Sequence, residues 1–223
     1  MRRPVLLLLM AVVLFAGFSE KPCLAGDPPV LSVDEILKRV ESRYDSQAFS
    51  AHFFQTSVIA SMDITETASG SVSIKRPGMM RWVYEIPQKQ TIVTDGKTLW
   101  VYRPDDHQVS MGSAPTLFGG GKGAGFLSNI QEIRKSFQVN LEKINASREY
   151  VLKLVPIQKT WDIEHVLLHI NSESFDIVEA ATTNSYKDET RIELSDIQLN
   201  QQLDDSLFQF IIPQGAEVIR MDE

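Results

Sequence analysis

The chain has 223 residues, a formal net charge of −7 and a single cysteine. This length suits one domain with a sizeable core. The acidic balance argues against nucleic acid and against electrostatic docking on anionic lipid. One cysteine excludes an internal disulfide and a zinc site built from several cysteines.

The first 25 residues have the composition of a secretory signal peptide. A basic pair at positions 2 and 3 precedes an apolar run over residues 5–18, and positions 23–25 offer a cleavage site after Ala25. An uncleaved anchor is the lesser alternative, because this run is shorter than the roughly 20 residues of a spanning helix. Lipidation at Cys23 is a further alternative, disfavoured because residues 19–22 read Ser-Glu-Lys-Pro.

Cleavage after Ala25 leaves one domain, residues 26–223, in which we identify no linker and no repeat. The removed segment holds three basic residues and one acidic residue, so its loss shifts the formal charge from −7 to −9. An exported domain without cysteine suits a bacterial periplasm, which is the expected location.

A helix is expected at the start of this domain. Ser32 and Glu35 have the Ser-x-x-Glu spacing of a capping box. Apolar residues then recur at spacings of three and four along one stripe: Val33, Ile36, Leu37, Val40 and Tyr44.

From Phe49 onward the apolar period changes to two, which predicts strands. Bulky apolar side chains are most frequent in Gly70–Pro104, where three alternating runs are separated by turns at residues 75–78 and 95–96. The last alternating run, residues 208–212, is predicted to be a closing strand. About ten short strands at regular spacing predict a mainly β domain, built as one antiparallel sheet or barrel.

One segment interrupts the strands. Residues 116–125 read TLFGGGKGAG, and residues 126–137 are predicted to form a short helix. A flexible surface loop is one interpretation, and a gate or lid is the other. A phosphate-binding loop is excluded, because Thr116 and Gly123 stand where that motif needs glycine and a hydroxyl residue.

Catalytic and metal-binding patterns are weak. His165 and His169 lie four apart in a predicted strand, where that spacing spans about 13 Å and is too long for one zinc ion, so both are expected to face solvent. There is no Gly-x-Ser-x-Gly motif and no carboxylate pair that stands out. We therefore expect no enzyme, no metal and no cofactor, with a secreted hydrolase as an alternative.

Large apolar side chains are the remaining feature, with seven aromatic residues between positions 49 and 102. An ordinary barrel core is one explanation. A sheet too wide to fill its own interior, and therefore containing an apolar cavity, is the other. Which face of each strand looks inward stays open, because a one-residue shift exchanges the two faces.

Several motifs agree with a known family. They are Phe54-Gln55-Thr56, Gly70–Pro77, Trp82, Pro87, Ile92–Tyr102, Phe208-Gln209-Phe210 and Pro213-Gln214-Gly215. On these motifs the chain resembles the LolA family of periplasmic lipoprotein carriers, least closely over residues 112–175. The resemblance implies a single incomplete, half-open antiparallel β-barrel with an N-terminal helix and a helical or loop lid.

The resemblance also implies a function without catalysis. The carrier takes acylated lipoproteins from an inner-membrane ABC transporter, shields their acyl chains and delivers them to an outer-membrane acceptor. A monomer is expected, with no nucleic-acid partner. Because each methylene exposed to water costs about 0.8 kcal/mol, the acyl chains need an apolar cavity. The residues assigned to this cavity are Phe49, Phe53, Met80, Trp82, Tyr84, Leu99 and Val101.

Arg76 is the predicted lid latch. In the family, the arginine of the Lys-Arg-Pro motif donates hydrogen bonds to lid carbonyl groups in the closed form, a role that suits the five fixed donors of a guanidinium. From the residues alone, Arg76 would simply occupy a turn before Pro77. Two departures from the family are Met80, where an aromatic residue is frequent, and the glycine-rich loop Gly119–Gly125.

Two alternatives use the same fold. A carrier of free lipids, such as hopanoids or glycolipids, would need the same cavity. A lipid-sensing regulatory module, as in periplasmic anti-sigma regulators, would carry a second C-terminal domain, and the ten residues after Pro213 are expected to count against it.

Overall fold

The computed structural model describes residues 30–45, 48–114, 130 and 132–221. The predicted signal peptide, 1–25, and the predicted loop, Gly119–Gly125, lie outside the described residues. Within the described part of the chain, no helix combines the length and apolar content needed to cross a bilayer.

Helix α1, Val33–Arg43, confirms the predicted N-terminal helix. The Ser32 side chain accepts a hydrogen bond from the backbone N–H of Glu35, at 3.2 Å, and so caps the first turn. The predicted apolar stripe is buried at Ile36, Leu37 and Val40. A second, short helix, α4, covers Glu132–Ser136 and falls within the helix predicted over residues 126–137.

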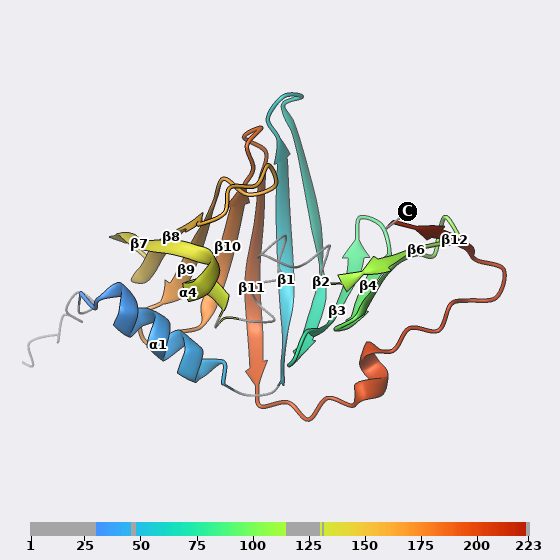
Figure 1. Cartoon of the computed structure of the whole chain (residues 1–223), viewed down its shortest axis with the longest axis horizontal. Helices are drawn as coiled ribbons and strands as arrows, with labels where there is room; N and C mark the ends of the chain where they lie inside the picture. Colours follow the sequence, from blue (N-terminus) through green and yellow to red (C-terminus); the bar gives the residue numbers. More distant parts are fainter. Residues whose placement is uncertain (1–29, 46–47, 115–129, 131, 222–223) are drawn as a thin grey trace, which may run out of the picture.

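The described strands form one twelve-stranded sheet with the order β12-β6-β5-β4-β3-β2-β1-β11-β10-β9-β8-β7. Their bounds are β1 Ala48–Ile59, β2 Ile64–Lys75, β3 Met79–Ile86, β4 Gln90–Asp95, β5 Thr98–Arg103, β6 Gln108–Ser113, β7 Phe137–Ile144, β8 Glu149–Pro156, β9 His165–Asn171, β10 Ile177–Thr183, β11 Glu189–Leu199 and β12 Glu217–Arg220. All pairs are antiparallel except β12 with β6, which is parallel. The sheet is open, with β7 and β12 at its edges, which agrees with the predicted half-open barrel (Figure 1).

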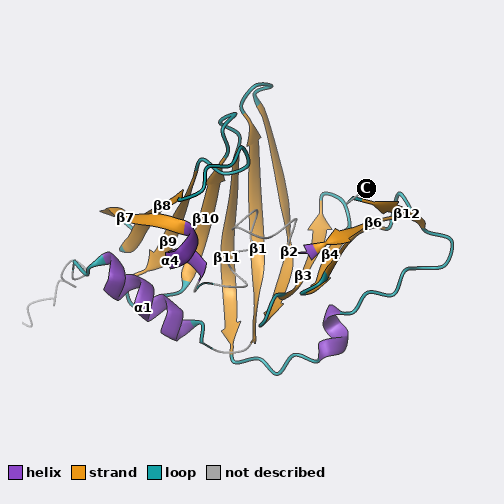
Figure 2. Cartoon of the chain, viewed as in Figure 1, coloured by secondary structure: helices purple, strands orange, loops and turns teal. Residues whose placement is uncertain are grey.

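Both helices cover the same face of the sheet, over the half formed by β7 to β11 (Figures 1 and 2). We call this the inner face and the opposite one the outer face. Buried side chains of α1 join a continuous apolar core with inward-pointing residues of the strands, such as Leu152, Leu168 and Ile177. The main core therefore lies between the helices and the inner face.

The predicted closing strand over residues 208–212 is wrong. Phe208 ends a 3₁₀ helix, η2, Asp205–Phe208, and the chain then crosses the outer face without pairing until β12. The alternation reflects packing instead: Phe208 is buried, whereas the Ile211 side chain is 88% exposed. Two cations hold this segment in place, since Lys75 Nζ donates to Leu203 O and Arg81 Nη1 donates to Leu207 O.

Candidate functional site

The strand register places all seven predicted cavity residues on the inner face. Phe53 stands opposite Gly70, and Gly70 stands opposite Tyr84. Residues that face each other across antiparallel strands point to the same side of the sheet. The same relation, followed from β1 to β5, puts the cavity residues in one surface: Phe49, Phe53, Met80, Trp82, Tyr84, Leu99 and Val101. We call this surface the apolar wall.

Aromatic contacts connect the middle of the apolar wall. The ring of Phe53 meets Trp82 edge-on at 5.0 Å between centroids, and it meets Tyr84 in the same way at 4.8 Å. The hydroxyl of Tyr84 donates to Gln55 Oε1 at 3.0 Å. Burial raises the pKa of Tyr84, so the hydroxyl keeps the proton that it donates to Gln55.

The wall is covered to different degrees along its length. Phe49, Phe53, Met80 and Trp82 belong to the same buried core as α1, whereas Tyr84 is partly buried at its margin. Leu99 is buried outside that core, and Val101 is half-buried. The wall therefore runs from a buried part on β1 and β3 that joins the main core toward a less covered part on β5.

Trp100 and Tyr102 do not belong to the apolar wall, although they alternate with Leu99 and Val101. Both point to the outer face, where Phe210 lies 6.2 Å from Trp100 and 5.7 Å from Tyr102 between ring centroids. Trp100 and Tyr102 therefore pack against the C-terminal segment and do not line the inner face. No local feature of the sequence distinguishes the two groups, because the division follows from the strand register.

The helical cover is fixed to the sheet and to itself by ion pairs. Arg43 at the end of α1 makes two hydrogen bonds to Asp176, 2.8 and 3.2 Å long, in the turn before β10. Arg134 of α4 donates to Asp34 Oδ1 and to Glu41 Oε1 of α1, each at 2.6 Å. These contacts tie α4 to α1 and α1 to the β9–β10 turn. Sequence reasoning missed them, because no local pattern reports a partner so far away along the chain.

Arg76 directly follows β2, close to the residues that end α1. Its side chain is half-buried, and its Nη2 atom is buried without a hydrogen-bond partner among the described residues. Burial lowers the pKa of Arg76, while the nearby charge of Asp45 acts in the opposite direction. A guanidinium with an unsatisfied buried donor is available to bind another acceptor. The loop Gly119–Gly125, for which a lid is one of the two sequence interpretations, lies outside the described residues.

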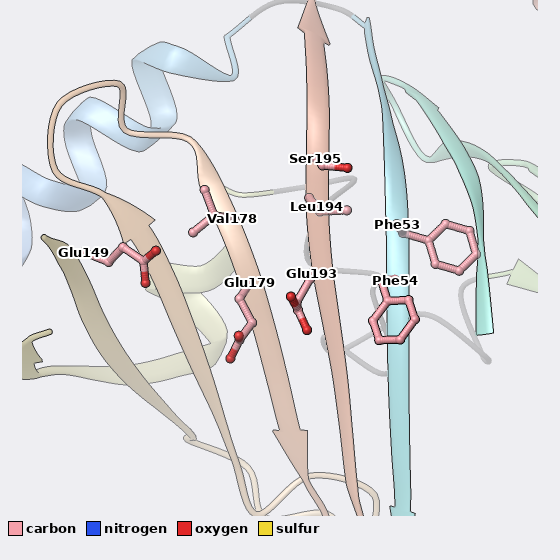
Figure 3. A pocket seen from close by; sticks show the side chains of 8 residues that line it. All are labelled: Phe53, Phe54, Glu149, Val178, Glu179, Glu193, Leu194 and Ser195. Atoms are coloured by element: carbon pink, nitrogen blue, oxygen red, sulfur yellow. The ribbon is translucent and has the colours of Figure 1, made fainter. Parts of the chain in front are cut away.

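A pocket of about 340 Å³ lies beside β1, β10 and β11 (Figure 3). Acidic side chains come to it from β8, β10 and β11: Glu149, Glu179 and Glu193. On its margin, His169 bridges two of them, with Nδ1 3.1 Å from Glu149 and Nε2 3.5 Å from Glu179. His169 was expected to face solvent, but its side chain is only 20% exposed, because these carboxylates enclose it. In the part of the chain that is described, no cluster of His, Cys, Asp or Glu is arranged to hold a metal ion.

An open antiparallel sheet with an apolar wall on one half of its inner face and helices over the other half defines a half-barrel suited to apolar ligands. The chain belongs to the LolA family, since the model of that family, described as outer membrane lipoprotein carrier protein LolA, matches residues 45–211. The resemblance read from the sequence motifs is thereby confirmed.

Curated relatives named outer-membrane lipoprotein carrier protein include two that align over most of this chain. That of Nitrosomonas europaea is 33% identical over 209 residues, covering 89% of this chain and 94% of the relative. That of Azotobacter vinelandii is 27% identical over 214 residues, covering 96% and 97%. A crystal structure of an uncharacterized conserved protein from Thermus thermophilus matches with a TM-score of 0.56 at 15% identity, over 85% of this chain and 99% of that one. It supports the fold alone.

Proposed function

We propose that the protein is a periplasmic carrier of acylated lipoproteins, which holds their acyl chains against the apolar wall and performs no catalysis. The observation that carries this proposal is the wall itself, in which seven apolar side chains from β1, β3 and β5 share one face of an open sheet. The relatives named as lipoprotein carriers support it.

Cargo binding requires the cover to give way. Phe49, Phe53 and Trp82 are each 3% exposed, so an acyl chain reaches them only when covering side chains move aside. The covered form is the closed state, and the form that exposes the wall is the open state. Cargo binds the open state and shifts the equilibrium toward it, which requires that the closed state be favoured by only a few kcal/mol. Met80 adds an unbranched, adaptable side chain at the centre of the wall, which suits acyl chains of varied packing.

Arg76 is proposed to stabilise the closed state as a latch. Its unsatisfied buried Nη2 supports this role, because closing would give that donor an acceptor. The proposed partners are an inner-membrane lipoprotein-releasing ABC transporter, which loads the carrier, and an outer-membrane acceptor, which unloads it. The carrier is proposed to act as a monomer with a cleaved signal peptide, 1–25.

The test is a release assay. Membranes that contain a lipoprotein-releasing transporter and radiolabelled lipoprotein are incubated with ATP and the purified chain 26–223. We expect lipoprotein to appear in the soluble fraction as a one-to-one complex with the carrier. Lipoprotein that stays in the membrane, while a carrier from a relative releases it, would overturn the proposal.

A second measurement distinguishes lipoprotein cargo from free-lipid cargo. Native mass spectrometry of protein isolated from its own periplasm reports the mass of whatever is bound. A lipoprotein mass supports the carrier proposed here. A mass of one free hopanoid or glycolipid, together with no release activity, would assign the wall to free lipid instead.

A further inference from the structure

Three loops emerge at one end of the sheet. Val58, Glu189, Thr183 and His165 lie at one level across β1, β11, β10 and β9, because each pairs with the next. Beyond this level the chain turns back in the β1–β2 tip, the β10–β11 turn and the β8–β9 loop. The tips of β1–β2 and β10–β11 rise together at the top of Figure 1. We call residues 60–64, 157–164 and 184–188 the tip rim.

The loops of the tip rim are bonded to one another. The backbone N–H of Ala60 donates to Asp188 Oδ1 at 3.0 Å, which joins the first loop to the third. The N–H of Ser185 donates to the carbonyl of Trp161 at 3.2 Å, which joins the third to the second. The tip rim is therefore one connected surface at the end of a long sheet.

Large apolar side chains are exposed on each loop of the tip rim. Their exposed fractions are 66% for Met62, 41% for Ile64, 55% for Ile157, 75% for Trp161 and 68% for Tyr186. Single exposed apolar residues are ordinary, but five that gather in one rim joined by hydrogen bonds are of the kind that marks a contact surface.

The charged side chains of the tip rim do not form a patch of one sign. Lys187 Nζ pairs with Glu164 Oε2 at 2.5 Å, and this pairing lowers the pKa of Glu164. Besides this pair and Asp188, the three loops carry two acidic residues and one basic residue, which are Asp63, Asp162 and Lys159. A partner recognised mainly by charge would need a field of one sign, so the surface is better suited to apolar contact.

Indole and phenol rings favour the boundary between water and hydrocarbon, because each has an apolar body and one polar end. We propose that the tip rim is a membrane-contact surface, which places Met62, Trp161 and Tyr186 in the headgroup region of a zwitterionic bilayer. The acidic chain as a whole disfavours an anionic surface. The purpose of this contact, approach to the membranes between which cargo moves, rests on the proposed function, but the contact itself is testable without cargo.

The experiment is vesicle flotation with the purified chain 26–223 in the absence of cargo. Vesicles contain phosphatidylethanolamine and phosphatidylcholine, with or without phosphatidylcholine brominated on its acyl chains, which quenches nearby tryptophan. We expect binding that is insensitive to salt and is not increased by phosphatidylglycerol. Brominated lipid is expected to quench the wild type and to lose that effect in Trp161→Phe, which retains buried Trp82 and packed Trp100.

Substitution then locates the contact. The triple variant Met62→Ser, Trp161→Ser, Tyr186→Ser is expected to bind vesicles at least about tenfold more weakly, since three apolar side chains are lost from the interface. The matched control is Ile211→Ser, which changes a side chain that is 88% exposed on the C-terminal segment. We expect it to bind like the wild type.

Each other outcome overturns the membrane assignment. Absence of wild-type binding overturns it, as does quenching that persists in Trp161→Phe or an equal loss in Ile211→Ser. A triple variant that keeps vesicle binding but fails to receive or deliver lipoprotein would assign the tip rim to a protein partner instead. Release of lipoprotein from transporter-containing membranes is measured separately, so failure of the proposed function is distinguished from failure of this contact.

Discussion

Phe53 on β1 stands directly opposite Gly70 on β2, and the absence of a side chain at Gly70 leaves room for the Phe53 ring and for the neighbouring strand β3. A Cβ atom at Gly70 would lie 1.9 Å from the carbonyl oxygen of Val83 and 3.1 Å from the Phe53 ring. The first distance is far below van der Waals contact, and the obstructing atom is backbone. The centre of the apolar wall therefore depends on a position without a side chain.

Gly70→Ala is expected to destabilise the fold by about 1–3 kcal/mol, the usual cost of overpacking a core. The β2–β3 pair must separate to admit the methyl group. Urea unfolding measures the change in free energy of unfolding. Ser71→Ala, a half-buried neighbour that points to the outer face, serves as the control. A Gly70→Ala protein as stable as wild type would contradict the close approach of β2 and β3 at Gly70.

Periodicity in the sequence was enough to predict α1 and the strand-rich body, because both depend on local spacing. It left open which face of each strand looks inward, and the seven cavity residues were assigned only with the family resemblance. It did not predict how the aromatic residues divide. Trp100 and Trp82 have similar local patterns, yet one packs on Phe210 at the outer face and the other on Phe53 at the inner face. Register and long-range pairing decide such questions, and neither is encoded in the period of a single strand.

The end of the chain and His169 illustrate the same limit. Residues 208–212 alternate like a strand, but the segment packs across the outer face and only Glu217–Arg220 pairs with β6. His169 was expected to be exposed, but Glu149 and Glu179 reach it from the two neighbouring strands. In both places the partner is supplied by tertiary structure.

Tyr44→Phe is expected to lower stability by about 1–3 kcal/mol, because it leaves a buried backbone donor unsatisfied. The Tyr44 hydroxyl accepts from the N–H of Ile177 at 3.0 Å, and the side chain is 1% exposed. The measurement is urea unfolding, with Tyr186→Phe, a substitution at an exposed position, as the control. Equal stabilities of the two variants would show that this bond does not hold α1 to the sheet.

Acidification is expected to destabilise the protein partly through His165. Burial lowers its pKa in the folded state, and Lys153 lowers it further. Below about pH 6.5 the unfolded chain therefore binds this proton more readily than the folded chain, and stability falls as the pH falls. Above that pH, His165 does not make the free energy of unfolding depend on pH.

We expect His165→Gln to lose less stability than wild type between about pH 7 and pH 5, the range in which an ordinary histidine titrates. Unfolding at both values gives the two differences, and His52→Gln, at an exposed position on β1, should behave as wild type. A His165→Gln slope identical to the wild-type slope would contradict the assignment.

Val101→Asp is expected to weaken binding of a fluorescent acyl probe at least about tenfold, because it places a carboxylate where hydrocarbon should lie. Val101 is half-buried, so the substitution alters the wall without inserting a charge into its buried part on β1 and β3. Thr67→Asp adds the same charge at an exposed position of β2 on the outer face and should bind the probe normally. Equal losses in both variants would argue against the wall as the cargo surface.

Arg76→Leu is expected to permit loading but to slow delivery. The latch would stabilise only the closed, cargo-free state, so its removal favours the loaded state and makes release harder. Hydrogen bonds from a charged donor contribute about 1.5–3 kcal/mol, which corresponds to roughly 10- to 150-fold stronger retention of cargo. Transfer of labelled lipoprotein from the soluble complex to outer-membrane vesicles measures the effect.

Arg81→Leu provides the matched control, because Arg81 donates to Leu207 O of the C-terminal segment on the outer face. It should reduce stability but leave the ratio of delivered to loaded cargo unchanged. Arg76→Lys keeps the charge but loses the planar fork, so it should deliver at an intermediate rate. If all three variants deliver cargo at the wild-type rate, Arg76 is a turn residue, and its buried Nη2 is an unsatisfied donor without a part in release.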